Sequence, residues 1–193
     1  MDNLKNFFSG HKIIFAILGV ILLAEVVYAV KVLVFSAPPP LPARKTNIQK
    51  TAGKISLTTP KTNYKVNEIA SVSVIIDTGG HTVDGVDLVV RFDPKSLEAT
   101  PGGLVKSGIF DEYPLVAVDK KLGLISISGV NSLKKGYQGT GRFAVLNLKA
   151  KLPGNTSVTV DFNKGSTTDS NLVESGLSKD ILEVVDNLEL VVQ

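Results

Sequence analysis

Histidine and cysteine, the side chains that most often carry catalysis or bind transition metals, are scarce in this sequence. It has no cysteine and two histidines, His11 and His81. The lack of cysteine excludes disulfides and thiolate metal sites. A Ser–His–Asp triad would have to use His81, because His11 precedes a long apolar segment, and the surrounding DTGGHTVDG predicts a surface turn. The sequence therefore predicts a protein without enzymatic activity and without a cofactor.

Three acidic residues, Asp77, Asp84 and Asp87, lie close together in the sequence. A glycosidase needs two carboxylates on opposite sides of a cleft, and nothing in the pattern places these residues in that way. Their oxygens could hold a calcium ion, although no EF-hand loop is present. We interpret them as solvated turn residues and leave calcium binding open. Segments 161–163 (DFN) and 169–171 (DSN) are interpreted likewise, as turn formers.

The apolar run of residues 13–35 bears on the cellular localisation of the protein. Its 23 residues rise about 34 Å as a helix, close to the thickness of a bilayer core. Glu25 and Lys31 interrupt it; Lys31 can reach the interface, whereas the role of Glu25 stays open. The apolar pattern continues past a possible cleavage point at Ala29, which favours an uncleaved anchor over a signal peptide.

The charge is divided unevenly along the chain. Up to Lys54 there are seven basic and two acidic residues, and the remainder has 14 basic and 16 acidic residues. The C-terminal part has no cationic excess, which argues against binding to nucleic acid. We divide the chain into a short cytoplasmic N-terminus (1–12), a transmembrane anchor (13–35), a proline-rich linker (36–54) and a C-terminal domain (55–193).

Short alternating runs fill the C-terminal domain and are separated by glycine and proline turns. In GVDLVVRFDP, apolar side chains recur at every second position from Val86 to Phe92, and Asp93-Pro94 ends the run. Roughly nine such runs fit into this length, and no long amphipathic helix interrupts them. The pattern predicts an all-β sandwich that follows one transmembrane helix.

The order and spacing of these runs resemble the cohesin domain, a module of bacterial cellulosome scaffolds. The resemblance rests on ISLTTPKTNYKVNEIASVSVII as the opening, GVDLVVRFDPKSLEA, LGLISISGV, GTGRFAVLNLKAK, the turn TTDSNLVE and the closing strand LEVVDNLELVV. Phe92 stands where the family usually has tyrosine. The resemblance implies a nine-stranded jelly roll, an architecture shared with carbohydrate-binding modules, and a non-catalytic role in binding dockerins.

The resemblance also implies a binding surface on one strand face. Val89 lies between Asp87 and Arg91 on the solvated side of its strand. Mixed charge around one apolar residue suits a modest protein interface with a polar rim. The predicted partner-binding residues are Asp87, Val89, Arg91, Ser126 and Ser128.

These features predict a membrane-tethered, extracellular module for protein–protein adhesion or assembly at the cell surface. Its partner would be a dockerin-like module on another chain, with a further link to polysaccharide binding or breakdown. If the N-terminal segment is cleaved, the domain is secreted. One alternative is a carbohydrate-binding module, which without tryptophan would stack sugars on Tyr113 or Tyr137. A second alternative is a structural envelope protein without a specific ligand.

Overall fold

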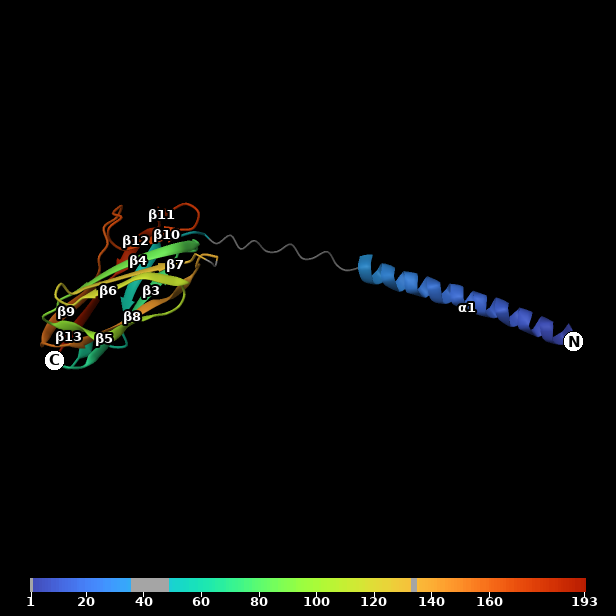
Figure 1. The fold of residues 1–193 in the computed structure, drawn as a ribbon, viewed down its shortest axis with the longest axis horizontal. Helices are drawn as coiled ribbons and strands as arrows, with labels where there is room; N and C mark the ends of the chain where they lie inside the picture. Colours follow the sequence, from blue (N-terminus) through green and yellow to red (C-terminus); the bar gives the residue numbers. More distant parts are fainter. Residues whose placement is uncertain (1, 36–48, 133–134) are drawn as a thin grey trace. The chain divides into compact units, whose positions relative to one another are not determined.

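The structure, a computed structural model, describes residues 2–35, 49–132 and 135–193 (Figure 1). The chain divides into two compact units, Met1–Asn47 and Ile48–Gln193. Most of the predicted proline-rich linker lies outside the described residues. The domain boundaries drawn from the sequence stay predictions.

The N-terminal unit contains one helix, α1 (Asp2–Phe35). Its segment Ile14–Val32 has a mean hydropathy of 2.3 and is long and apolar enough to cross a membrane. Leucine and alanine in this segment favour a helix, and Glu25 lies within it. A membrane anchor and a signal sequence both have such a helix.

The described part of the C-terminal unit consists of thirteen strands joined by turns. They are β1 (Gly53–Thr58), β2 (Asn63–Tyr64), β3 (Ile69–Asp77), β4 (Val83–Phe92), β5 (Leu97–Lys106), β6 (Glu112–Asp119), β7 (Leu124–Val130), β8 (Thr140–Ala150), β9 (Gly154–Val160), β10 (Asn171–Glu174), β11 (Lys179–Asp180), β12 (Leu182–Asp186) and β13 (Leu188–Val192).

These strands form two sheets, so the predicted all-β sandwich is confirmed (Figure 1). One sheet has the order β12-β1-β3-β8-β5. The other has the order β11-β10-β4-β9-β13-β2, and β7 followed by β6 extends it from the other side of β4. Most pairs are antiparallel, while β1 with β12 and β2 with β13 are parallel.

The predicted number of nine strands differs from the thirteen found among the described residues. Two of the additional strands, β2 and β11, have only two residues, too short for an alternating pattern. The predicted closing strand is two strands, since β12 pairs with β1 in one sheet and β13 pairs with β9 in the other. Between them the side-chain oxygen of Asn187 accepts a hydrogen bond from the Val160 amide at 2.9 Å, which fixes the crossing.

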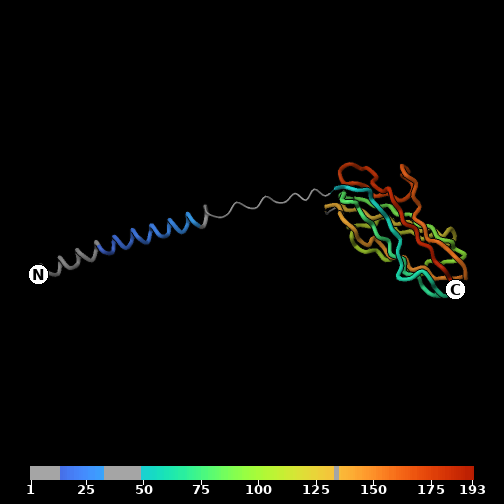
Figure 2. The backbone as a smooth tube through the Cα atoms, turned by 180° about the vertical axis from the view of Figure 1, so that it is seen from behind, coloured from blue at the N-terminus to red at the C-terminus, as the bar shows by residue number. Residues whose placement is uncertain are grey.

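The hydrophobic core lies within the C-terminal unit and follows the alternation of its strands. Every second residue from Val86 to Phe92 is buried, as the sequence predicted. On β8, Phe143 is fully buried and meets the ring of Phe110 edge-on, with ring centroids 5.7 Å apart. Figure 2 shows the C-terminus at the end of this unit opposite to its first described residues. The outer faces of β4 and β7 therefore lie over a layer of buried side chains.

Candidate functional site

The residues predicted for partner binding lie on neighbouring strands. Asp87 is paired with Ser128, and Val89 with Ser126, in the antiparallel ladder of β4 and β7. The Ser128 hydroxyl donates a hydrogen bond to the Asp87 carboxylate. The fold thus brings these four residues together, because cross-strand pairs project from the same face of a sheet. Arg91 lies farther along β4, opposite Leu124.

Val89 is half-buried, not an isolated exposed valine. The segment that joins β9 to β10 and the side chain of Leu115 on β6 border a hollow of about 240 Å³ over this valine. The hollow is lined by Asp87, Leu88, Val89, Leu115, Ser126, Ser128, Thr167, Thr168 and Asp169. Sequence reasoning missed the last three, since they come from a segment that it treated as a simple turn.

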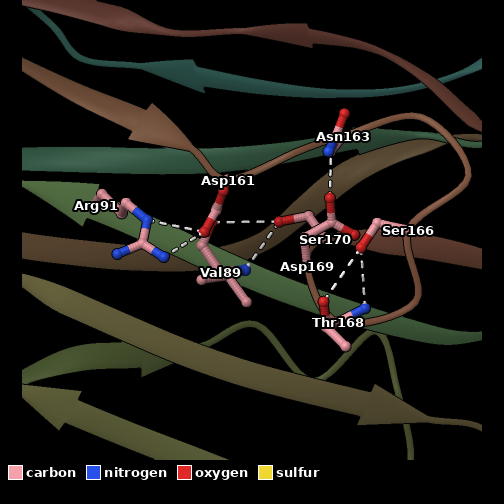
Figure 3. Close-up of polar contacts among 8 residues, drawn as sticks. All are labelled: Val89, Arg91, Asp161, Asn163, Ser166, Thr168, Asp169 and Ser170. Carbon is pink, nitrogen blue, oxygen red and sulfur yellow. Dashed lines mark hydrogen bonds and ion pairs between the residues drawn. The ribbon is translucent and has the colours of Figure 1, made fainter.

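The segment over the hollow is fixed to the middle of β4 by a serine. The Ser170 hydroxyl accepts a hydrogen bond from the Val89 amide at 2.9 Å and donates one to the Val89 carbonyl at 3.2 Å (Figure 3). The Ser170 amide also donates to the Asp161 carbonyl at 2.9 Å. A side chain here replaces the backbone partner that a neighbouring strand would supply. Ser170 is fully buried, so this attachment is protected from water.

Arg91 forms an ion pair beside the hollow. Its Nε and Nη2 lie 2.8 and 2.6 Å from Oδ2 of Asp161, at the end of β9 (Figure 3). Arg91 does not line the hollow. Of the five predicted binding residues, four therefore surround one depression, and the fifth is occupied with an intramolecular partner.

Asp169 is the least expected residue of the site. The sequence interpretation of residues 169–171 as an exposed turn is wrong, because Asp169 is 8% exposed and Asn171 begins β10. Oδ2 of Asp169 accepts a hydrogen bond from the Asn163 amide (Figure 3). Its Oδ1 is buried and has no hydrogen-bond partner among the described residues. A buried polar atom without a partner costs free energy, so it points to a role beyond packing.

A second buried carboxylate, Glu174, contacts Lys50 near the beginning of the C-terminal unit and His81 in the turn after β3. Its Oε1 lies 2.8 Å from Nζ of Lys50 and 2.7 Å from Nδ1 of His81. Hydrogen bonds from Lys50 and then His81 lower the pKa of Glu174 to about 2. His81 lies in a turn, as the sequence predicted, because its amide donates a hydrogen bond to the Thr78 carbonyl at 3.0 Å. The histidine that could have served a catalytic triad is thus engaged in a contact with Glu174 that joins distant segments.

Asp77, Asp84 and Asp87, which the sequence offered as possible calcium ligands, do not form a metal-binding cluster among the described residues. Oδ1 of Asp77 accepts a hydrogen bond from the Gly79 amide at 2.9 Å, as in a local turn. Within the described ranges, no group of three or more histidine, cysteine, aspartate or glutamate side chains is placed to hold a metal ion.

The two tyrosines considered for sugar stacking pack against the core. The ring of Tyr113 stacks on Phe143 with centroids 5.6 Å apart, and Tyr137 lies 6.2 Å from Phe110. Burial, helped by the negative charge of Asp77, raises the pKa of Tyr137. Neither ring therefore offers a free platform to a sugar.

No family model matches the sequence, and no curated protein matches it. Solved structures do match the C-terminal unit. A cohesin from Clostridium acetobutylicum has 16% identity and a TM-score of 0.61, with 76% of this chain and 94% of the cohesin covered.

Two further solved structures agree with this match. A type II cohesin from the cellulosome of Acetivibrio cellulolyticus has 15% identity and a TM-score of 0.58, covering 72% of this chain and 95% of its own. A type I cohesin solved in complex with a dockerin, from Clostridium thermocellum, has 11% identity and a TM-score of 0.58, covering 74% and 100%. The C-terminal unit has the fold of cohesin modules.

Proposed function

We propose that the C-terminal unit is a non-catalytic recognition module that binds a dockerin-type module on another polypeptide. The observation that carries this proposal is the hollow on the outer face of β4 and β7, with an apolar floor at Val89 and acidic and hydroxyl groups around it. An apolar centre within a polar rim is the usual composition of a protein-binding surface. Solved structures of this fold in complex with dockerins support the same assignment.

We further propose that α1 is an uncleaved anchor that holds this unit outside the cell, at the cell surface. The apolar segment Ile14–Val32 has the length of a membrane span. N-terminal sequencing of the mature protein tests this proposal. The expected result is a chain that retains α1, and a mature chain that begins at Val30 would instead show a secreted protein.

The binding proposal is tested with Val89→Asp in the fragment 48–193. This fragment contains the whole hydrophobic core, so we expect it to fold by itself. We expect wild-type fragment to bind at least one member of a panel of type I and type II dockerins in biolayer interferometry. Val89→Asp should weaken that binding by roughly 1–3 kcal/mol, because it removes the apolar centre of the face.

Val184→Asp is the matched control, since Val184 is an exposed valine on β12 in the other sheet. It should leave dockerin binding unchanged. Equal binding by wild type and Val89→Asp, or no binding to any dockerin, would contradict the proposal. Retention on insoluble polysaccharide that is lost on truncating Tyr113 or Tyr137 would favour a carbohydrate-binding module instead.

A further inference from the structure

The hollow over Val89 combines two kinds of wall. Val89 and Leu115 supply aliphatic surface, and Leu115 is 45% exposed. Asp87 and Asp169 supply two carboxylates on the same hollow. Hydroxyl groups of serine and threonine complete the lining. A ligand that fits must therefore have an aliphatic part and a part that interacts with carboxylates.

Asp169 holds an unused hydrogen-bond acceptor at this hollow. The residue is more than nine-tenths buried, and its Oδ1 has no partner among the described residues. The torsion that turns an aspartate carboxylate has a broad energy minimum, so the carboxylate can adjust when a ligand enters the hollow that Asp169 lines. A donor from a ligand would supply the hydrogen bond that the chain itself does not.

The cations nearest to this site along the chain are occupied elsewhere. Arg91 pairs with Asp161, and Lys164 lies 3.4 Å from Glu183. No lysine, arginine or histidine is among the described residues that line the hollow. No ion pair of Asp87 or Asp169 with a described cation is present, and a positively charged ligand would complement these two carboxylates.

We propose that this hollow receives one long basic side chain, lysine or arginine, of the protein partner. The aliphatic stem of that side chain would lie along Val89 and Leu115, and its charged end would bind Asp87 and Asp169. A bare metal ion would make no use of the aliphatic wall. The inference rests on the proposed function, since it names the chemistry of the partner at that same face.

The test uses n-butylammonium and n-butylguanidinium, which carry the stem and charge of these side chains. Each is titrated into ¹⁵N-labelled fragment 48–193 and followed in ¹H–¹⁵N correlation spectra. We expect saturable shifts at the amides of Val89, Ser126 and Thr168. Butanol, which has the stem without the charge, should shift them far less at equal concentration.

Asp169→Asn is the decisive variant. The amide side chain can keep the bond from the Asn163 amide while it places a donor where Oδ1 was. We expect affinity for n-butylammonium to fall about tenfold or more, because a charge-assisted hydrogen bond is lost. Asp87→Asn, at an exposed position, should weaken binding as well without any risk to folding. Asp161→Asn, outside the hollow, should have little effect.

Several results would overturn the inference. One is the absence of saturable shifts with either cation, and another is equal binding by wild type, Asp169→Asn and Asp87→Asn. Calcium chloride that moves the same amides at lower concentration would make the hollow an inorganic cation site. These titrations need no dockerin, so they remain readable if the proposed function fails. If a dockerin binds both aspartate variants as it binds wild type, the inference fails while the proposed function stands.

Discussion

Two buried carboxylates, Asp169 and Glu174, lie five residues apart at either end of the short segment that contains β10. Both residues are less than 9% exposed. Glu174 faces the ammonium group of Lys50 and the imidazole of His81, at 2.8 and 2.7 Å. Asp169 has one backbone amide, that of Asn163, and a second oxygen without a described partner. The same type of group thus has two side-chain partners on one oxygen at Glu174, and only a backbone partner at Asp169.

The difference distinguishes a carboxylate that is paired within the fold from a carboxylate at the proposed binding site. Lys50 and Glu174 are 124 residues apart in sequence, so their contact ties the beginning of the unit to β10. Asp169 is held by its own connecting segment and is among the residues that line a hollow on the surface. Removing one partner of a buried ion pair is destabilising because it leaves a charge uncompensated, whereas a buried charge without a partner already carries that cost and can gain a partner from a ligand. The following variants test this division.

The largest loss of stability is expected in the core beneath β10, the strand that lies between Asp169 and Glu174. Leu172 is fully buried in β10, between the two carboxylates. Leu172→Ala should lower the free energy of unfolding by about 2–5 kcal/mol, because a cavity replaces a packed side chain. Urea unfolding of fragment 48–193 measures this change. Leu177→Ala, at a position that is 68% exposed, should stay within about 0.5 kcal/mol, and an equal loss in both variants would contradict the packing described for β10.

Glu174→Gln should give a stability loss that depends on pH. The pKa of Glu174 is about 2 in the folded protein, below its usual value of 4.5. The carboxylate therefore stabilises the fold above about pH 4.5, and this contribution is lost as the pH falls toward 2. Thermal unfolding from pH 7 down to pH 2 should show wild type above Glu174→Gln at neutral pH, with the gap closing in acid. A gap that does not change between pH 4.5 and 2 would refute the assigned ion pairs.

Asp169→Asn should change stability much less than it changes binding. The substitution removes a charge that has one hydrogen-bond donor and no cationic partner among the described residues. We expect the free energy of unfolding to shift by no more than about 1 kcal/mol in either direction. Urea unfolding at pH 7 checks this value. If Asp169→Asn instead destabilises the fragment as strongly as Glu174→Gln, Asp169 serves the fold and the contrast between the two carboxylates is lost.

The smallest loss of stability is expected for the exposed ion pair of Arg91 with Asp161. Arg91 is 56% exposed and pairs with Asp161. Arg91→Ala should cost about 0.2–1 kcal/mol of unfolding free energy, and less at high salt, because water and ions screen an exposed pair. Urea unfolding in low and high salt measures both quantities. A loss that does not depend on salt would show that Arg91 acts through packing of its stem.

The strand β4 could be predicted closely, whereas β10 could not. Alternation over ten residues identifies the buried face of β4 and its outward residues. β10 has four residues, three of them buried, and its two buried polar residues face segments that are distant in sequence. Asn171 is buried opposite Asp87, and the buried Glu174 takes its partners from Lys50 and His81. A local pattern has no information about such partners, so a buried polar strand was mistaken for an exposed turn.

The sequence by itself determined the all-β class, the apolar N-terminal helix and the outward positions of Asp87, Val89 and Arg91. These features depend on periodicity and composition, which are local properties. Only the tertiary structure decided that Leu115, Thr168 and Asp169 join Val89 around one hollow, because they come from β6 and from the segment before β10. It also decided that Arg91 pairs with Asp161 and that His81 contacts Glu174. Contacts between residues about 70 to 120 positions apart are set by how the sheets pack, and no short stretch of sequence contains them.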